Sequence, residues 1–132
     1  MATHATPFVV FEFKPEQNAV HATWKDTTAM ATEDQIKESM LEYVKFIDTY
    51  RAPNLLVNEK DMKFEFSPSF QAWMDENVSE KARNMGSVRF AFIKSEDFII
   101  GLAAEMVMEQ VASNAPVRFF DNAQEAEAWL IS

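Results

Sequence analysis

The sequence predicts an α/β fold built on a mixed, mostly parallel five-stranded sheet with four helices. Short runs rich in Val, Ile and Phe alternate along the chain with longer segments whose apolar residues recur at helical spacing. Ser, Thr or Asn precedes most of the helical segments, where these residues serve as N-caps. The resulting order is ββαβαβαβα, and alternation of strands with helices favours parallel pairing through right-handed crossovers.

Length and composition predict one globular domain over residues 1–132. The hydrophobic content is 48% and the charged content 25%, which is ordinary for a soluble domain. No apolar run approaches the roughly 20 residues that span a bilayer. The first residues have neither a basic flank nor the apolar core of a signal peptide, so we expect a cytoplasmic protein without membrane insertion.

The charge and the residue counts exclude several classes of function. A formal net charge of −9 argues against nucleic acid and anionic membranes, which bind clustered Lys and Arg. Because cysteine is absent, there are no disulfides, thiolate nucleophiles or common zinc clusters. Twelve Phe and eight Met predict a Phe-rich core with Met as filler. The alternative is that part of this apolar surface faces a second subunit or an apolar ligand.

The chain opens with a predicted hairpin. Residues 8–14 and 19–25 read as strands because they are aromatic, β-branched or alternating, and residues 15–18 form the turn. His21 falls on the polar side of the second strand and is predicted to be a solvated strand residue. Residues 1–7 are expected to form a loose N-terminal tail.

A capping box marks the first helix. Thr32 and Gln35 have the spacing at which each side chain bonds the other residue's backbone, so the helix should begin here and run to about Tyr50. Its core stripe is predicted to comprise Ile36, Met40, Val44 and Ile47. Pro53 prevents continuation, and residues 55–57 are apolar on both faces, as in an interior parallel strand.

The central stretch joins this strand to the second helix. A charged approach at residues 59–61 leads into the segment Met62–Phe66, which we call the lip and in which apolar and charged residues alternate. Ser67 and Pro68 are the residues preferred at an N-cap and at the first helical position. The helix should run to Met85 and end at Gly86 in a left-handed cap.

The remaining elements complete the alternation. Residues 87–94 form the next strand, and Ser95 caps a third helix whose body, residues 98–111, is apolar nearly all round and therefore buried on several sides. Residues 116–121 form the last strand, and Asn122 opens a short final helix. Arg89 and Arg118 indicate that one sheet face is less thoroughly covered than the other.

With the elements in order, the chain resembles the SpoIIAA-like superfamily, including STAS domains and the STAS/SEC14-type small bacterial proteins. The resemblance covers the whole chain as a pattern of short motifs. These are Ala22-Thr23-Trp24, Thr32, Leu55-Leu56-Val57-Asn58, Ser67-Pro68, Trp73, Phe90-Ala91-Phe92, Phe119-Phe120-Asp121, Glu125-Ala126 and Trp129-Leu130.

The resemblance implies a mixed sheet covered mainly on one face and a non-catalytic role. Better-known members are anti-sigma factor antagonists, stressosome components and transporter tails. In the antagonists a Ser or Thr at the matching helix N-terminus is phosphorylated, which makes Ser67 the candidate phosphorylation site. This chain departs from that motif, because Asn58 replaces the usual Asp, residues 59–66 are an insertion, and Ser67-Pro68-Ser69 contains no glycine.

Catalysis is not expected, so this chain is predicted not to be an enzyme and to need no cofactor. The two glycines cannot form a phosphate-binding loop, and no metal-ligand motif is present. Carboxylate pairs such as Glu59 with Asp61 are interpreted as solvated surface. A divalent cation near Asn58, Glu59 and Asp61 has no ligand spacing that selects it. No catalytic or metal-binding residue is therefore assigned.

Two hypotheses for function remain. The first is a regulatory module, expected to be a homodimer, that meets protein partners through the strand, the lip and the second helix. The second is a small carrier of an apolar or acyl ligand, held between residues 98–111 and the sheet. The lip itself has two interpretations: it is a binding element, or it folds back on the sheet or Trp73 and closes the core. The residues assigned to partner or ligand binding are Asn58, Asp61, Met62, Phe64, Phe66 and Trp73.

Overall fold

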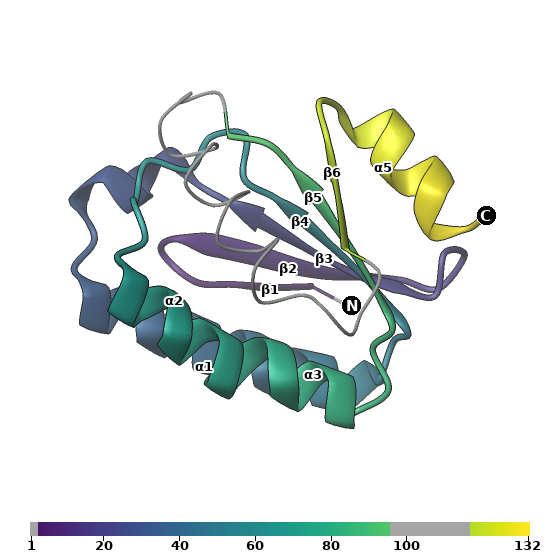
Figure 1. Ribbon diagram of the computed structural model, residues 1–132, viewed down its shortest axis with the longest axis horizontal. Coiled ribbons are helices and arrows are strands. Elements are labelled where there is room, and N and C mark those ends of the chain that lie inside the picture. Colours follow the sequence, from purple (N-terminus) through teal and green to yellow (C-terminus); the bar gives the residue numbers. More distant parts are fainter. Residues whose placement is uncertain (1–2, 96–116) are drawn as a thin grey trace.

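The computed structural model describes residues 3–95 and 117–132 and confirms an α/β architecture (Figure 1). Its mixed sheet has six strands in the order β1-β2-β3-β4-β5-β6. The pairs β1–β2 and β2–β3 are antiparallel, and the pairs from β3 to β6 are parallel. The strands are β1 (Thr3–Ala5), β2 (Val9–Lys14), β3 (Ala19–Trp24), β4 (Asn54–Asn58), β5 (Arg89–Ile93) and β6 (Val117–Phe120).

The described helices cover the two faces of the sheet unequally (Figure 1). The larger core lies under α1 and under α2, η2 and α3, which together we call the second helical segment. The smaller core lies under α5. The helical elements are η1 (Asp26–Met30), α1 (Glu33–Tyr50), α2 (Pro68–Met74), η2 (Asp75–Ser79), α3 (Glu80–Asn84) and α5 (Ala123–Leu130). The predicted helix body at residues 98–111 lies outside the described residues.

The expectation of a loose tail is wrong for residues 3–5. They form β1, which adds a sixth strand to the five that were predicted. Thr6 reverses the chain, since its buried hydroxyl oxygen accepts the backbone N–H groups of Phe8 and Val9 at 3.1 and 2.9 Å. This turn places β1 antiparallel to β2, with His4 opposite Phe11. His4 Nε2 also lies 2.9 Å from Glu42 Oε1 on α1. A local polar turn therefore fixes a segment that composition alone suggested was free.

The first helix follows its predicted boundaries. The capping box is present, because Gln35 N–H donates to Thr32 Oγ1 at 3.2 Å and Thr32 N–H donates to Gln35 Oε1 at 2.9 Å. Ile36, Met40 and Ile47 are buried as expected. Val44 is half-buried, and Tyr43 takes the inward position beside it. The inward stripe is thus rotated slightly from the predicted one.

The second helix follows the predicted path but is interrupted in its middle. Ser67 caps α2 through a hydrogen bond from the Phe70 N–H to its Oγ at 3.1 Å. Residues 75–79 form the π-helical turn η2 before α3 resumes. Gly86 follows with a φ of +105°, the positive region predicted for the helix end.

The second face of the sheet carries α5 and the two arginines that indicated thinner cover. Arg89 donates to the carbonyls of Trp129 and Ser132 at 3.0 and 2.8 Å, so it caps the end of α5. Its guanidinium and that of Arg118 both lie within 6 Å of the Trp129 ring, at 5.6 and 5.9 Å. Among residues 3–95 and 117–132, no helix combines the length and apolar character needed to cross a bilayer.

Replacing Thr32 with Ala removes the hydroxyl that accepts the Gln35 N–H. We expect the free energy of unfolding to fall by about 1 kcal/mol, because the helix start loses the side-chain acceptor for one of its backbone N–H groups. Urea denaturation followed by circular dichroism measures the change. Thr32→Ser keeps the acceptor and should match the wild type, so equal stability of the Ala and Ser variants would contradict a role for the cap.

Candidate functional site

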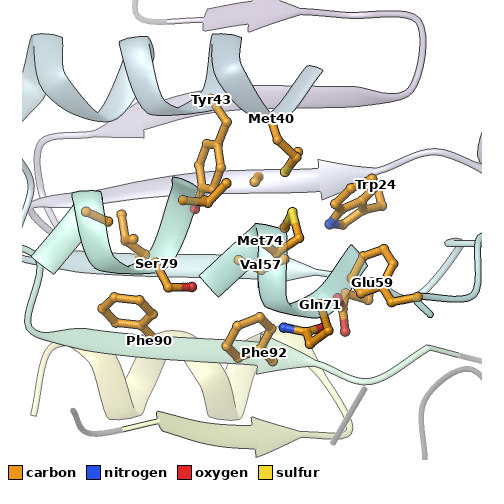
Figure 2. Close-up of a pocket in the computed structure, with 15 residues that line it drawn as sticks. Trp24, Met40, Tyr43, Val57, Glu59, Gln71, Met74, Ser79, Phe90 and Phe92 are labelled. Atoms are coloured by element: carbon orange, nitrogen blue, oxygen red, sulfur yellow. The ribbon is translucent and has the colours of Figure 1, made fainter. Parts of the chain in front are cut away.

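An enclosed cavity of about 50 Å³ lies between the sheet and the helices of the larger core (Figure 2). The strands β3, β4 and β5 supply its floor, α1 and the second helical segment supply its roof, and the lip closes one end. Its lining is largely apolar, with four polar side chains among the residues that face it. The lining residues used below are Trp24, Tyr43, Glu59, Phe66, Gln71, Ser79, Phe90 and Phe92.

Glu59 brings a carboxyl group to this cavity, and the residue is buried. It directly follows β4, and its side chain is only 4% exposed. Its backbone N–H donates to the Ile93 carbonyl at 3.0 Å, and its own carbonyl accepts the Met62 N–H at 3.1 Å. These two bonds form a turn that holds the side chain inward. The prediction that Glu59 belongs to the solvated surface is therefore wrong, although Asp61, two residues later, is exposed.

Burial changes the acidity of this carboxyl group. Desolvation penalises the charged form and raises the pKa of Glu59 to about 8. Within residues 3–95 and 117–132, no hydrogen bond or ion pair to the Glu59 carboxyl group offsets this penalty. The group is therefore mostly protonated at neutral pH and can both donate and accept a hydrogen bond.

Tyr43 brings a second polar group to the cavity from α1. Its ring stacks on Phe11 with centroids 5.1 Å apart, and its side chain is 4% exposed. The hydroxyl has no hydrogen-bond partner among the described residues, and burial raises its pKa, so it stays protonated. The sequence signal was present, because Tyr43 lies four residues before the core residue Ile47.

The π-helical turn η2 shapes the roof. A π turn inserts one extra residue into a helix and is frequent at functional sites. Val78 from this turn is buried, and Ser79 at its end faces the cavity with its hydroxyl (Figure 2). Gln71, one turn earlier in α2, is 4% exposed and lies near Glu59 in the same view. Nothing in the residue pattern of the second helix had predicted this interruption.

The lip closes the core, which is one of the two outcomes expected for it. Met62 is fully buried, and the half-buried Phe64 and Phe66 pack against Phe70, with ring centroids 5.5 and 5.0 Å away. Phe66 also meets the Trp24 ring edge-on at 6.0 Å. Of the predicted site residues, Phe66 is the one that also lines the cavity.

The other predicted site residues lie outside the cavity lining. Asn58 stabilises the turn after β4, because its Oδ1 accepts the Lys60 N–H at 3.0 Å. Trp73 is half-buried and carries the Lys37 ammonium group 5.3 Å from its ring centre. Ser67 is exposed at the start of α2, where its hydroxyl is the helix cap, and phosphorylation there stays a prediction.

The cavity combines a few hydrogen-bonding groups with an apolar lining. Glu59, Tyr43, Gln71 and Ser79 place hydrogen-bonding groups against an apolar lining, and Glu59 is the carboxyl group among the described lining residues. Within the part of the chain that the structure describes, no three His, Asp or Glu side chains gather closely enough to hold a metal ion. These residues therefore offer hydrogen bonds and, from the Glu59 carboxyl group, one exchangeable proton.

Comparison of the chain with protein-family models, with curated proteins and with solved structures finds no match in any of the three. The site is therefore interpreted from its own geometry.

The buried carboxyl group makes stability depend on pH in a specific direction. The pKa of Glu59 is about 8 in the folded protein against an ordinary 4.5, so the folded state holds a proton that the unfolded chain has released. The contribution of this proton to the free energy of unfolding is fully present below about pH 4.5. It falls by about 1 kcal/mol for each unit by which the pH rises, up to about pH 8. Glu59→Gln should remove this slope and leave the variant more stable than the wild type near the upper end.

Urea denaturation of both proteins across that pH range measures the effect. Burial lowers the pKa of His21, so this residue also contributes to the pH dependence of stability. Its contribution is the same in both proteins and cancels when their stabilities are subtracted. Parallel stability curves for the wild type and the Gln variant would show that Glu59 is solvated.

Proposed function

We propose that this chain is a non-catalytic, SpoIIAA-like regulatory module that acts through protein contacts and forms a homodimer through its lip. The observation that carries the proposal is the state of the lip backbone. Among the described residues, no hydrogen bond uses the backbone N–H of Phe64, Glu65 or Phe66. An extended segment with free N–H groups is a template for pairing with another chain.

The side chains of the lip support pairing with a second copy. The lip places its apolar side chains inward, while Lys63 and Glu65 are exposed on either side of Phe64. In an antiparallel pair centred on Phe64, each Lys63 lies opposite Glu65 of the other copy. A two-fold interface is self-complementary, so this arrangement gives two opposite-charge pairs across the strands.

The closed core supports binding at the surface rather than transport of a large ligand. The lip fills the end of the core with Met62, Phe64 and Phe66, and the cavity behind it measures about 50 Å³. Pockets for drug-sized ligands occupy about 300 to 1,000 Å³. The cavity behind the lip is therefore too small for a drug-sized or acyl ligand.

Charge reversal tests the dimer. Lys63→Glu places like charges opposite each other twice, and each unfavourable cross-strand pair is worth about 0.2–1 kcal/mol. We expect the dimer dissociation constant to rise roughly three- to thirtyfold in light scattering after size exclusion, since 1.4 kcal/mol is about a factor of ten. Glu65→Lys should have the same effect, and the double variant Lys63→Glu, Glu65→Lys should restore the dimer.

Lys81→Glu on α3 is the matched control, because it makes the same change in net charge at an exposed site away from the lip. A wild-type protein that remains monomeric at tens of micromolar would contradict the proposal, as would a double variant no better than the single ones.

Native mass spectrometry of freshly purified protein separates the module from the carrier. The module should show the mass of the polypeptide or of its dimer alone. A co-purified acyl or lipid molecule would contradict the proposed function and support the carrier hypothesis.

A further inference from the structure

Two polar groups that face the cavity have no hydrogen-bond partner among the residues that the structure describes. The Tyr43 hydroxyl is buried and has no hydrogen-bond partner among the described residues. The Glu59 carboxyl group is 4% exposed, and in the same part of the chain no cation or N–H group pairs with it. Buried polar groups are usually hydrogen-bonded, and each exception needs an explanation. Both side chains line the same cavity, Tyr43 from α1 and Glu59 from the end of β4 (Figure 2).

The size of the enclosure limits that molecule to a few atoms. A volume of about 50 Å³ compares with the 10–15 Å³ that one water molecule requires by the same measure. The space therefore takes about three or four non-hydrogen atoms.

The walls favour a positive charge. Five of the lining residues are aromatic, namely Trp24, Tyr43, Phe66, Phe90 and Phe92. Aromatic rings attract cations through the negative potential of their faces, and the attraction grows when the cation is desolvated. We propose that the cavity is a binding site for a small alkylammonium ion, paired with the Glu59 carboxylate and enclosed by these aromatic side chains.

A cation supplies what Glu59 lacks. A carboxylate buried without a partner is costly, and an opposite charge at contact distance favours its ionised form. Among the lining residues that the structure describes, the only other titratable side chain is Tyr43, from α1, and the lining side chains from β3, β5 and the second helical segment do not ionise. On that segment the guanidinium of Arg83 lies 5.7 Å from the Phe90 ring, but Arg83 is not among the lining residues. No lining residue that the structure describes carries a positive charge.

Binding should release a proton. The pKa of Glu59 is about 8 in the empty protein, so near neutral pH the carboxyl group must lose its proton to pair with the ammonium ion. The proton leaves to solvent while the ammonium ion keeps its own, because alkylammonium groups ionise near the Lys value of about 10.4. Below about pH 8, the apparent affinity should therefore increase about tenfold for each unit by which the pH is raised. A neutral ligand that accepts the carboxyl proton would show the opposite dependence.

Titration with ethylammonium chloride tests the site in the intact chain. Trp24 fluorescence and the thermal midpoint are followed at about pH 6, 7 and 8, where the fraction of ionised Glu59 spans a wide range. We expect saturable binding with a dissociation constant on the order of millimolar at about pH 8, which is near the limit for a ligand of three heavy atoms. Affinity should fall about tenfold between about pH 7 and 6. Ethanol, the neutral molecule of the same size, and potassium chloride at equal ionic strength should not compete.

Two variants complete the test. Glu59→Gln preserves the shape of the side chain but cannot ionise, so ethylammonium binding and its pH dependence should both disappear while circular dichroism stays that of the folded protein. Tyr43→Phe removes one hydrogen bond and should weaken binding severalfold. The proposal is overturned if the folded wild type shows no saturable binding at about pH 8, or if affinity rises as the pH falls. It is equally overturned if the Gln variant binds as well as the wild type. Because the cavity lies within one copy, these outcomes are independent of the dimer test.

Discussion

The hydrogen bond from the Glu59 backbone N–H to the Ile93 carbonyl determines the shape of the site. It ties the residue after β4 to the end of β5 and so extends the contact between these strands by one position. The chain then turns back through the Met62 N–H, and the lip settles on Phe70 at the start of the second helical segment. One backbone contact thus places the buried carboxyl group, closes the core and leaves the outer edge of the lip free.

Two polar groups in the interior, on Glu59 and Tyr43, lower the stability of the folded protein. An unpaired buried carboxyl group raises the free energy of the folded state near neutral pH, and Tyr43 adds a second unsatisfied group. A Gln, Leu or Met in place of Glu59 would avoid the penalty at little cost in volume. Local features that lower stability are common at binding sites, where the missing partner is the ligand. The coincidence of these groups with a π-helical turn strengthens that interpretation.

The sequence predicted those parts of the molecule that depend on local chemistry. The capping box at Thr32, the Ser67 cap, the Gly86 turn and the parallel strands on either side of β4 all follow from residue type and spacing. The inward face of the lip also follows, because its apolar residues alternate with charged ones.

The carboxyl site depends on tertiary contacts and was therefore missed. Glu59 sits between Asn58 and Lys60 in a charged run that looks solvated, and only the bond to Ile93, thirty-four residues later, turns it inward. The strand at residues 3–5 was missed for a different reason, because the turn signal at Thr6-Pro7 was present but the short segment before it was taken for a tail.

The sequential order of the six strands has a consequence for biosynthesis. Each described strand pairs with the strand that precedes it in the chain, so no strand waits for a distant partner to be translated. The sheet can grow one strand at a time as the polypeptide leaves the ribosome, with α1 available to cover its apolar face before β4 has emerged. Such vectorial assembly limits the time during which a Phe-rich surface is open to aggregation in the cell.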